Sequence, residues 1–361
     1  MPRTSQDQAR NAALSAADAE AAIDLSIVIV NWNVRELLRR CLASIAGSDA
    51  LFVEGAQPPA QNAGGVKHHW LAEVIVVDNA SSDDSVSMLA EAFPWLQVIA
   101  NRQNLGFTKA NNQGLAASRG RYVLFLNPDT EATPQAIDQM LAYAESHPKV
   151  GVLGPQLRYG DGSLQSSRRR FPTLATFFLE STVLQQRLLR APRKGWPRNR
   201  VLDRYFVLDK PDDAISPVDW VVGACMLVRR AVLNAIGGFD EGFFMYSEEL
   251  DLCHRVVDAG WQVVYYPPAV VTHYEGKSSE QVVAARHIRF HTSRVRYARK
   301  YHGAAAAAAV RAFLLLTFAF QWAEECVKWL AGWILPSQRA KQVMRRERMA
   351  AYRQVLGSQL R

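Results

Sequence analysis

The chain has 361 residues and a formal net charge of +8; 49% of its residues are hydrophobic and 21% are charged. This composition excludes an intrinsically disordered chain, and the positive charge favours anionic partners such as nucleotide phosphates, nucleic acid or an acidic membrane surface. The four cysteines, at positions 41, 225, 253 and 326, form no CxxC pair, which argues against a zinc site or a disulfide framework and favours a reducing cytosol.

The N-terminal part of the chain begins with a polar stretch and then a strand. Residues 1–24 contain no apolar run of the signal-peptide kind, so we expect a polar leader. The segment 25–33, LSIVIVNWN, predicts a buried strand that ends in polar residues, and helical spacing follows until Gly47. Residues 48–69 are rich in Gly, Pro, Gln and His and are expected to form a surface insertion.

Strands and helices then alternate along most of the chain. Strands are predicted at 73–79 (EVIVVDN), 96–100 (LQVIA) and 121–129 (RYVLFLNPD), with helices between them. The pattern weakens from 155 to 217 and returns with a strand and a helix over 218–238 and another strand over 260–276. This alternation predicts an α/β fold with a mixed, mostly parallel sheet flanked by helices.

Polar residues follow the predicted strands at their carboxyl ends, where ligands bind in open α/β sheets. They are Asn31 to Asn33, Asp78 and Asn79, Asn101 to Asn104, and Asn127 to Asp129. The first strand is not followed by GxGxxG, and the chain has no GxxxxGK[ST]. The sequence therefore lacks the main motifs of dinucleotide oxidoreductases and of P-loop NTPases. Asp129 is either a turn residue, since NPD favours turns, or a ligand for a hard divalent cation.

The stretch MYSEELDLCHR, residues 245–255, places Glu248, Glu249 and Asp251 within four residues, directly after the aromatic end of GGFDEGFF. A solvated helix face mixes charges of both signs and lacks such an aromatic lead-in. The pattern therefore favours a carboxylate that takes part in chemistry and whose pKa is raised by apolar surroundings.

Seven segments together resemble a known enzyme family. They are SIVIVNWN, VIVVDNASSDDS, NLGFTKANNQG, YVLFLNPD, DWVVGACMLVRR, GGFDEGFFMYSEELDLCHR and VTHYEGKSS, in this order. On these segments the chain resembles the inverting family-2 glycosyltransferases of GT-A fold, and most of all their bacterial rhamnosyltransferase branch. The resemblance spans roughly residues 25–280. It implies a GT-A domain at 25–285, with a nucleotide-binding half at 25–130 and an acceptor and catalytic half at 131–285.

The resemblance implies that the first strand ends hold the nucleotide of a sugar donor. The implied donor-binding residues are Val30, Trp32, Asn33, Asp78, Asn79, Arg102, Asn104, Gly106, Asn127 and Asp129. Trp32 is expected to stack on a pyrimidine, with a packing role as the alternative. Asn79 stands where relatives often carry Asp; its amide suits the edge that uracil and thymine share, so the identity of the base stays open.

The resemblance also implies a metal site. The family's DxD motif is Asn127-Pro128-Asp129 here, so only its last acid survives. Asp129 and His273 are the implied ligands of Mg²⁺ or Mn²⁺, with the donor diphosphate completing the site; a structural role for His273 is the alternative. Lys277 and Ser278 are expected to contact phosphate.

The family's catalytic base lies in an ED pair that corresponds to Glu248-Glu249. Glu249 is therefore the implied base that takes the proton of the acceptor hydroxyl, with Glu248 or Asp251 as alternatives. Asp251 and Arg255 are expected to pair. Trp220, Gly223 and Arg168 resemble acceptor-side elements, and Arg168 to Arg170 are interpreted either as contacts for a lipid diphosphate or as part of a solvated loop.

Residues 286–361 are predicted to form a basic and amphipathic helical tail. The segment 286–302 carries six basic residues and no acid, and an apolar run that contains Arg311 follows. Further on, Trp322, Cys326, Trp329, Leu330 and Trp333 share one helical face. These features favour docking at the membrane interface, with a transmembrane span or packing against the core or a partner as alternatives.

The sequence as a whole predicts a metal-dependent inverting glycosyltransferase, peripheral on the cytoplasmic face of the membrane. It would move rhamnose from dTDP-rhamnose to a surface-polysaccharide or lipid-linked glycan acceptor, with UDP-hexose or UDP-N-acetylhexosamine as alternative donors. A weakly active nucleotide-sugar-binding scaffold is a second interpretation, because NPD replaces DxD and Glu249 replaces Asp. No nucleic-acid partner is expected, because the known recognition patterns are missing; the oligomeric state is left open.

Overall fold

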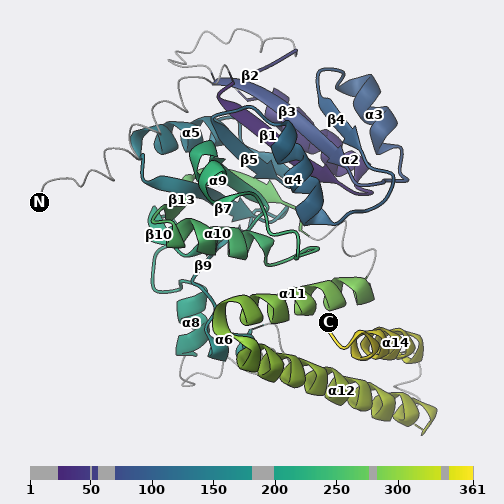
Figure 1. Ribbon diagram of the computed structural model, residues 1–361. Helices are drawn as coiled ribbons and strands as arrows, with labels where there is room; N and C mark the ends of the chain where they lie inside the picture. The colour runs from purple at the N-terminus through teal and green to yellow at the C-terminus, as the bar shows by residue number, and fades with distance from the viewer. Residues whose placement is uncertain are drawn as a thin grey trace, which may run out of the picture. The chain divides into compact units, whose positions relative to one another are not determined.

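The computed structural model describes residues 23–48, 51–55, 70–180, 199–275, 283–334 and 341–360. These residues form two compact units (Figure 1). Unit 1 consists of the described residues within 1–171, 209–242 and 248–278, and unit 2 of those within 172–208, 243–247 and 279–361. Unit 2 therefore joins the C-terminal tail to two segments from inside the predicted 25–285 domain.

Unit 1 is built on a mixed sheet in the order β10-β13-β7-β12-β5-β1-β3-β2, with β4, β6 and β8 paired at its margins. The strands are β1 Leu25–Asn31, β2 Leu51–Val53, β3 Trp70–Asp78, β4 Gln97–Ala100, β5 Tyr122–Leu126, β6 Thr130–Ala132, β7 Val150–Arg158, β8 Leu164–Gln165, β10 Ser216–Val218, β12 Cys225–Arg229 and β13 Gln262–His273. A separate ribbon pairs β9 Arg168–Arg169 with β11 Trp220–Val221.

The predicted α/β fold with a mixed sheet is confirmed. Strands β1 to β5 pair in parallel with their neighbours in the first half of the chain, as the strand–helix alternation predicts. Strand β12 runs antiparallel to both β5 and β7. Strand β2 lies inside the predicted insertion at 48–69, and residues 56–69 of that insertion lie outside the described residues.

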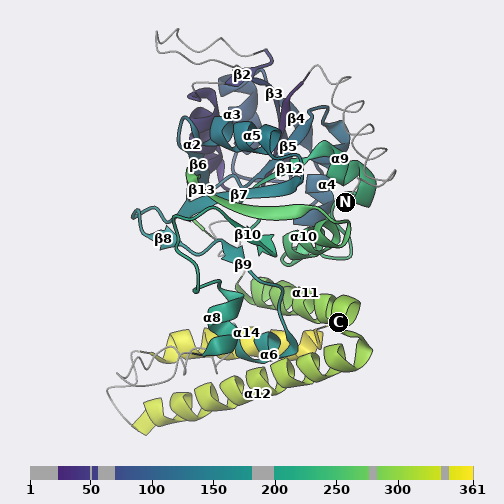
Figure 2. The ribbon, with the colours of Figure 1, turned by 90° about the vertical axis from the view of Figure 1, so that its left-hand side faces the viewer.

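Helices cover both faces of this sheet (Figures 1 and 2). They are α2 Arg35–Ala46, α3 Ser85–Ala92, α4 Phe107–Ala117, α5 Ala136–Ser146, α9 Arg230–Ile236 and α10 Glu248–Asp258. Alternate residues of β1 point to opposite faces: Ile27 and Ile29 pack in the cluster that contains Leu38 of α2, whereas Val30 packs with Ala110 of α4. Both faces of β1 are therefore core, which explains its unbroken apolar run.

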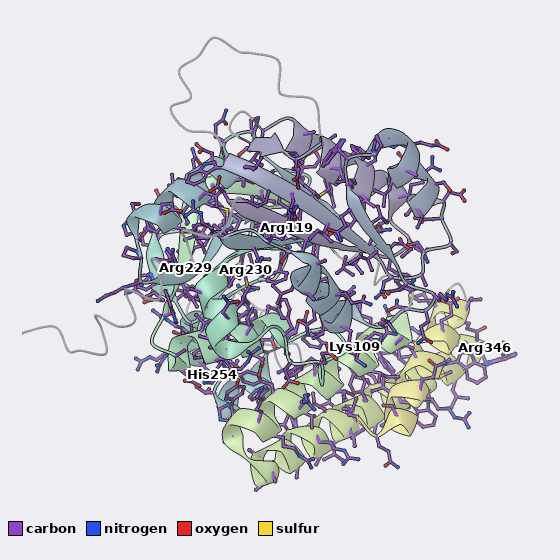
Figure 3. All side chains as sticks on the ribbon, turned by 45° about the horizontal axis from the view of Figure 1, so that its top comes forward. Lys109, Arg119, Arg229, Arg230, His254 and Arg346 are labelled. Atoms are coloured by element: carbon purple, nitrogen blue, oxygen red, sulfur yellow. The ribbon has the colours of Figure 1, made fainter. Side chains whose placement is uncertain are left out.

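Several arginines of unit 1 form ion pairs or hydrogen bonds within the fold. Arg119, Arg229 and Arg230 are labelled in Figure 3. Arg119 Nη2 lies 2.8 Å from Glu73 Oε2, and the buried Arg229 donates to Ala144 O at 2.6 Å. The positive net charge therefore partly serves the fold and by itself identifies no partner.

Unit 2 is helical. Its helices are α6 Leu174–Leu179, α8 Arg200–Tyr205, α11 Val283–His302, α12 Ala304–Ile334 and α14 Gln342–Ser358. The apolar run and the Trp-rich segment of the predicted tail form one continuous helix of 31 residues, α12. In the described part of the chain, α12 alone has the length and apolar composition of a membrane span, over Ala304–Trp333 with a mean hydropathy of 1.6. This criterion alone is weak evidence for a span.

Gly120 gives a prediction about stability. A Cβ at Gly120 would lie 2.5 Å from Ser26 N and 2.6 Å from the carbonyl carbon of Leu25, both of which are backbone atoms of β1. We expect Gly120→Ala to lower the free energy of unfolding by roughly 2–3 kcal/mol, because the backbone must shift to relieve the overlap. Urea unfolding followed by tryptophan fluorescence measures the change.

Gly47→Ala is the matched control for this experiment. Gly47 has a φ of −83°, and a Cβ there would come no closer than 3.4 Å to any atom outside its chain neighbours. The control should change the free energy of unfolding by less than about 0.5 kcal/mol. Equal effects of the two substitutions would contradict the steric explanation.

Candidate active site

The carboxyl ends of β1 and β3 form a polar edge. The parallel register pairs Asn31 with Asp78. Asn31 Nδ2 donates to Asp78 Oδ1 at 2.9 Å and to Ser81 Oγ at 3.1 Å, and Asp78 Oδ2 accepts from Ser81 N–H at 2.9 Å. Both residues of the pair are buried. Asp78 thus organises the loop after β3 at the edge where ligands bind in such sheets.

Asn79 is held in a network of amides. Its Nδ2 donates to Asn104 Oδ1 at 3.0 Å and to Gly106 O at 3.2 Å, and its Oδ1 accepts from Asn101 Nδ2 at 3.2 Å and Leu105 N–H at 3.0 Å. An amide has two N–H groups and one oxygen with two lone pairs, so these four bonds use its full capacity. Asn79 therefore shapes the 101–106 loop, and it must give up one of these bonds in order to contact a base.

The other predicted nucleotide contacts differ in exposure. The Val30 side chain is buried in the core, so that only its backbone faces the strand end. Trp32 and Asn33 are half-buried, and Asn33 adopts a left-handed backbone with φ 54° and accepts from Ser82 N–H at 2.7 Å. Arg102 is exposed. Trp32 and Arg102 thus keep side-chain surface for a ligand.

Asp129 and His273 are brought together by the pairing of β6 with β13. In this ladder His273 is opposite Thr130, and Tyr274 N–H donates to Asp129 O at 2.9 Å. His273 Nε2 lies 3.4 Å from Asp129 Oδ1, and both side chains are buried. His273 Nδ1 lies 3.0 Å from Gln165 Oε1. Two residues that are distant in sequence thus form one polar cluster.

The donor set at this cluster fits a hard divalent cation. Asp129 supplies a carboxylate, His273 an imidazole nitrogen, and Asn127 Oδ1 is buried without a hydrogen-bond partner among the described residues. No group of three or more His, Cys, Asp or Glu suited to a metal ion occurs in the described part of the chain. A cation held here would thus need further ligands from substrate or water, as Mg²⁺ usually does. Lys277 and Ser278 lie outside the described residues.

A turn before β12 connects this cluster to the acidic helix. Asn127 N–H donates to Ala224 O at 2.8 Å. The neighbouring Gly223 faces Glu249, since a Cβ on Gly223 would lie 3.2 Å from Glu249 Cβ. Glu249 lies in the first turn of α10. The end of β5, the turn at Gly223 and the start of α10 therefore form one continuous surface.

Burial raises the pKa of both glutamates at the start of α10. Glu248 is only 4% exposed; burial and the nearby charge of Glu249 raise its pKa well above the ordinary value. Burial also raises the pKa of Glu249, while hydrogen bonds with the backbone at Leu250 and Gly223 and the charge of Arg169 act in the opposite direction. The two carboxyls thus form one buried pair in which burial disfavours the ionised form of both.

Asp251 has a different environment. It is fully buried and accepts from Arg255 Nε at 2.9 Å, so the expected pair is present. Arg255 also donates to Ile236 O at 2.9 Å and Gly238 O at 2.8 Å. Asp251 thus ties α10 to the end of α9, which supports a structural role.

Two of the predicted acceptor-binding residues, Arg168 and Trp220, are buried and hydrogen-bonded within the protein. Arg168 is buried and donates to Lys210 O, Pro211 O and Asp212 Oδ1. Trp220 is buried, and its indole N–H donates to Arg170 O at 3.0 Å. These contacts hold the ribbon of β9 and β11 and give no geometric support for acceptor binding by Arg168 or Trp220.

Arg169 is the residue that sequence reasoning did not single out from its neighbours. It is half-buried, and its charge acts on Glu249 and on Tyr159. Neighbouring residues of a strand face opposite sides, so that Arg169 faces the site while Arg168 faces the fold. The sequence alone gave no signal for this choice, because β9 is only two residues long.

Two family profiles match the chain. Residues 26–206 match "Glycosyl transferase family 2", and residues 122–338 match "Glycosyl transferase family group 2". The chain belongs to glycosyltransferase family 2. The predicted resemblance is confirmed, and the second match extends beyond residue 280 through α11 and α12.

Two bacterial relatives are rhamnosyltransferases. The N-acetylglucosaminyl-diphospho-decaprenol L-rhamnosyltransferase of Mycobacterium tuberculosis is 32% identical over 231 residues, which cover 61% of this chain and 72% of the relative. The rhamnosyltransferase WbbL of Escherichia coli is 30% identical over 177 residues, which cover 47% and 61% respectively. A crystal structure of GalNAc-T7 with UDP, GalNAc and Mn²⁺ has a TM-score of 0.52 and 14% identity, and covers 83% of this chain and 57% of that one. At this identity the likeness supports the GT-A fold alone.

The contact between Gly223 and Glu249 gives a prediction about turnover. A methyl group at Gly223 would lie 3.2 Å from Glu249 Cβ, which is tighter than an ordinary contact, so Glu249 must move by a few tenths of an ångström. We expect Gly223→Ala to lower the kcat of glycosyl transfer by about 10-fold and to leave the KM for the donor unchanged, because only the carboxylate moves. Steady-state kinetics measure both. Wild-type kcat in a folded Gly223→Ala variant would contradict this prediction.

Proposed function

We propose that this glycosyltransferase moves L-rhamnose, with inversion, from dTDP-rhamnose to a lipid-linked or surface-polysaccharide acceptor. The observation that carries the reaction class is the Glu249 carboxyl beside Gly223, whose pKa is raised by burial. The sugar and the acceptor are supported by the names of the two bacterial relatives, one of which acts on a decaprenol-linked N-acetylglucosamine. The thymidine base rests on the family resemblance.

Glu249 acts as the base in this mechanism. The acceptor hydroxyl oxygen forms a bond to the anomeric carbon, and its proton passes to the Glu249 carboxylate. The bond between the anomeric carbon and the diphosphate oxygen breaks on the opposite face, so that the nucleoside diphosphate leaves with the electron pair. Such general-base assistance contributes about 10²–10⁴-fold. In this mechanism the neighbouring Glu248 is the protonated member of the pair, since burial and the charge of Glu249 raise its pKa well above the ordinary value.

Asp129 and His273 would hold a divalent cation, Mg²⁺ or Mn²⁺. The ion would neutralise charge on the departing diphosphate. Trp32 would stack on the base and Arg102 would pair with donor phosphate, because both keep exposed surface. Arg169 would contact the reacting sugar or the diphosphate, since its charge acts on Glu249.

UDP-hexose and UDP-N-acetylhexosamine are the second candidate donors. The hydrogen bonds of Asn79 are all used within the protein, so this side chain offers no means of telling uracil from thymine. A hexosyltransferase of Haloferax volcanii, Agl10, is also similar, at 25% identity over 236 residues.

Two adjacent substitutions test the role of Glu249. We expect Glu249→Gln to lower kcat by about 10²–10⁴-fold, because the base is lost. Glu248→Gln should retain activity within about 10-fold, because an amide replaces a neutral acid of the same shape. In the wild type, activity should fall as pH decreases through a pKa above the ordinary glutamate value, because burial raises the pKa of Glu249 and only its ionised form accepts a proton.

The assay is release of dTDP or UDP from a panel of nucleotide sugars, with lipid-linked acceptor and with Mg²⁺, Mn²⁺ or EDTA. Release with dTDP-rhamnose, dependence on metal and loss in Glu249→Gln support the proposal. Asp129→Ala should also abolish metal-dependent release. Nucleotide binding without turnover for any donor would instead favour the scaffold interpretation, and a sensitive Glu248→Gln with a tolerant Glu249→Gln would transfer the base role to Glu248.

We also propose that α12 docks on the surface of the membrane that carries a lipid-linked acceptor. Four exposed large side chains form one charge-free stripe: Leu316 is 70% exposed, Phe320 52%, Val327 67% and Leu330 58%, while Trp333, 59% exposed, lies beside it. Ala305, Ala309, Ala312 and Ala323 are exposed along the same line. The four charged residues of α12 lie off this stripe at 3.6 residues per turn. Apolar helix faces of this kind enter the interface between lipid headgroups and acyl chains.

The structure changes which residues would meet the membrane. Of the predicted Trp face, Trp322 and Trp333 are exposed, Trp329 is half-buried within unit 2 and Leu330 belongs to the stripe. The basic helix α11 is partly used inside the unit: Arg294 is buried and pairs with Glu180 at 2.8 Å. The apolar stripe is therefore the main membrane contact in this proposal, and it supports a peripheral location; the cytoplasmic side remains a prediction from the sequence.

Vesicle sedimentation tests this docking. Full-length protein should bind vesicles of phosphatidylcholine with phosphatidylglycerol, and the triple substitution of Leu316, Val327 and Leu330 by Gln should weaken binding by at least about 10-fold, because apolar surface no longer enters the bilayer. Val343→Gln, which alters a residue 71% exposed on α14, is the control and should leave binding unchanged. Unchanged vesicle binding of the triple variant would contradict membrane docking.

A further inference from the structure

Gln165 connects His273 to the outer part of the site. It lies on β8, where it pairs with Leu157 of β7, and Leu157 in turn pairs with Val271 of β13. Three neighbouring strands thus fix the position of Gln165 beside the end of β13. Its side chain is 7% exposed and lies between two partners, His273 on one side and Glu275 on the other.

The contact with Glu275 determines which way the Gln165 amide faces. Gln165 Nε2 donates to Glu275 Oε2 at 2.9 Å. An ionised carboxylate only accepts hydrogen bonds, so the NH₂ group of the amide must face Glu275 and the oxygen must face the other way. Gln165 Oε1 therefore faces His273 Nδ1, at 3.0 Å. Tyr159 also lies near this arrangement, since Glu275 and Gln165 both act on the pKa of its hydroxyl.

The orientation of the amide determines where His273 carries its proton. Gln165 Oε1 is an acceptor, so His273 Nδ1 must donate to it. In the neutral imidazole, the other nitrogen then has no hydrogen and presents its lone pair. That nitrogen, Nε2, lies 3.4 Å from Asp129 Oδ1, which is itself an acceptor. Two acceptors that face each other at this distance are stabilised by a cation between or beside them.

We propose that Gln165, oriented by Glu275, is a positioning residue that fixes the Nδ1–H tautomer of His273 and so presents Nε2 with Asp129 to a divalent cation. This inference rests on the metal site of the proposed function. Histidines that bind metals usually donate their other ring N–H to a neighbouring acceptor, and loss of that acceptor typically weakens metal affinity by about 10–100-fold. Here the acceptor is a side chain from a different strand.

Gln165→Leu tests the proposal in the full-length protein, with Gln156→Leu as the matched control. Gln156 is also 7% exposed; it lies on β7, and its Nε2 donates to Asp212 O at 3.1 Å. Both substitutions thus remove a buried amide of equal burial, but only one removes the acceptor of His273. Glu275→Gln is a conservative second variant, because its amide oxygen still accepts from Gln165.

The first measurement is the tautomer of His273 in metal-free protein. Nitrogen-15 NMR of histidine-labelled protein, in a buffer that keeps imidazoles neutral and with His273→Ala to assign the signals, should report the Nδ1–H form in the wild type and in Gln156→Leu. Gln165→Leu should shift His273 towards a mixture of tautomers. An Nε2–H form in the wild type, or the same tautomer in wild type and Gln165→Leu, would overturn the proposal.

The second measurement is Mn²⁺ affinity by electron paramagnetic resonance in the presence of a nucleoside diphosphate. We expect Gln165→Leu to weaken Mn²⁺ binding by about 10–100-fold, and Gln156→Leu and Glu275→Gln to change it by less than about 3-fold. Equal Mn²⁺ affinity in Gln165→Leu and wild type would overturn the role of Gln165. If His273→Ala also binds Mn²⁺ as the wild type does, the metal site itself is wrong, whereas the tautomer measurement still tests Gln165 separately.

Discussion

The antiparallel pairing of β12 with β5 is the constraint on which the candidate active site depends. Because the two strands run in opposite directions, β12 begins where β5 ends, and Asn127 is joined to Ala224 by a backbone hydrogen bond of 2.8 Å. Gly223, just before β12, meets Glu249, and Asp129, just after β5, meets His273. One strand pair therefore brings the proposed base and the proposed metal ligands to the same edge. A purely parallel sheet would place the start of β12 at the opposite edge.

The hydrogen bonds of the buried polar groups distinguish those that stabilise this edge from those that are available to substrate. Asn79 uses all four of its hydrogen bonds on the 101–106 loop, and Asp251 pairs with Arg255, so both hold neighbouring segments in place. Asn127 Oδ1 and one oxygen each of Glu248 and Glu249 are buried without a partner among the described residues. An unpaired buried polar atom costs about 1–3 kcal/mol. Such atoms lie on both sides of the turn at Gly223, which is the arrangement expected where a substrate supplies the missing partners.

The sequence predicted the parts of this molecule whose patterns are local. The β-branched runs predicted β1, β3 and β5, and the polar residues after them predicted the edge where the candidate site lies. Arg168 could not be distinguished from Arg169, because a two-residue strand has no periodicity to show which residue faces the fold. The hydrogen bonds of Asn79 could not be predicted either, because they join it to a loop more than 20 residues further along the chain. Unit 2 escaped prediction because it joins three separate stretches of sequence.

Helix α12 is apolar on its outer side as well as on the side where Val310, Leu314 and Phe318 are buried. Glu325 is only 8% exposed and faces α14, where Arg348 Nη1 lies 3.4 Å and Arg345 Nε 3.8 Å from its carboxylate oxygens. Leu316 and Val327 of the same helix are mostly exposed. Burial of a charge is unfavourable unless the charge is paired, and exposure of large apolar side chains in water is unfavourable as well. A helix that pairs its buried acid with arginines and leaves Leu316, Val327 and Leu330 exposed is suited to an apolar phase on its outer face, which is the physical reason for proposing a membrane surface as the environment of α12.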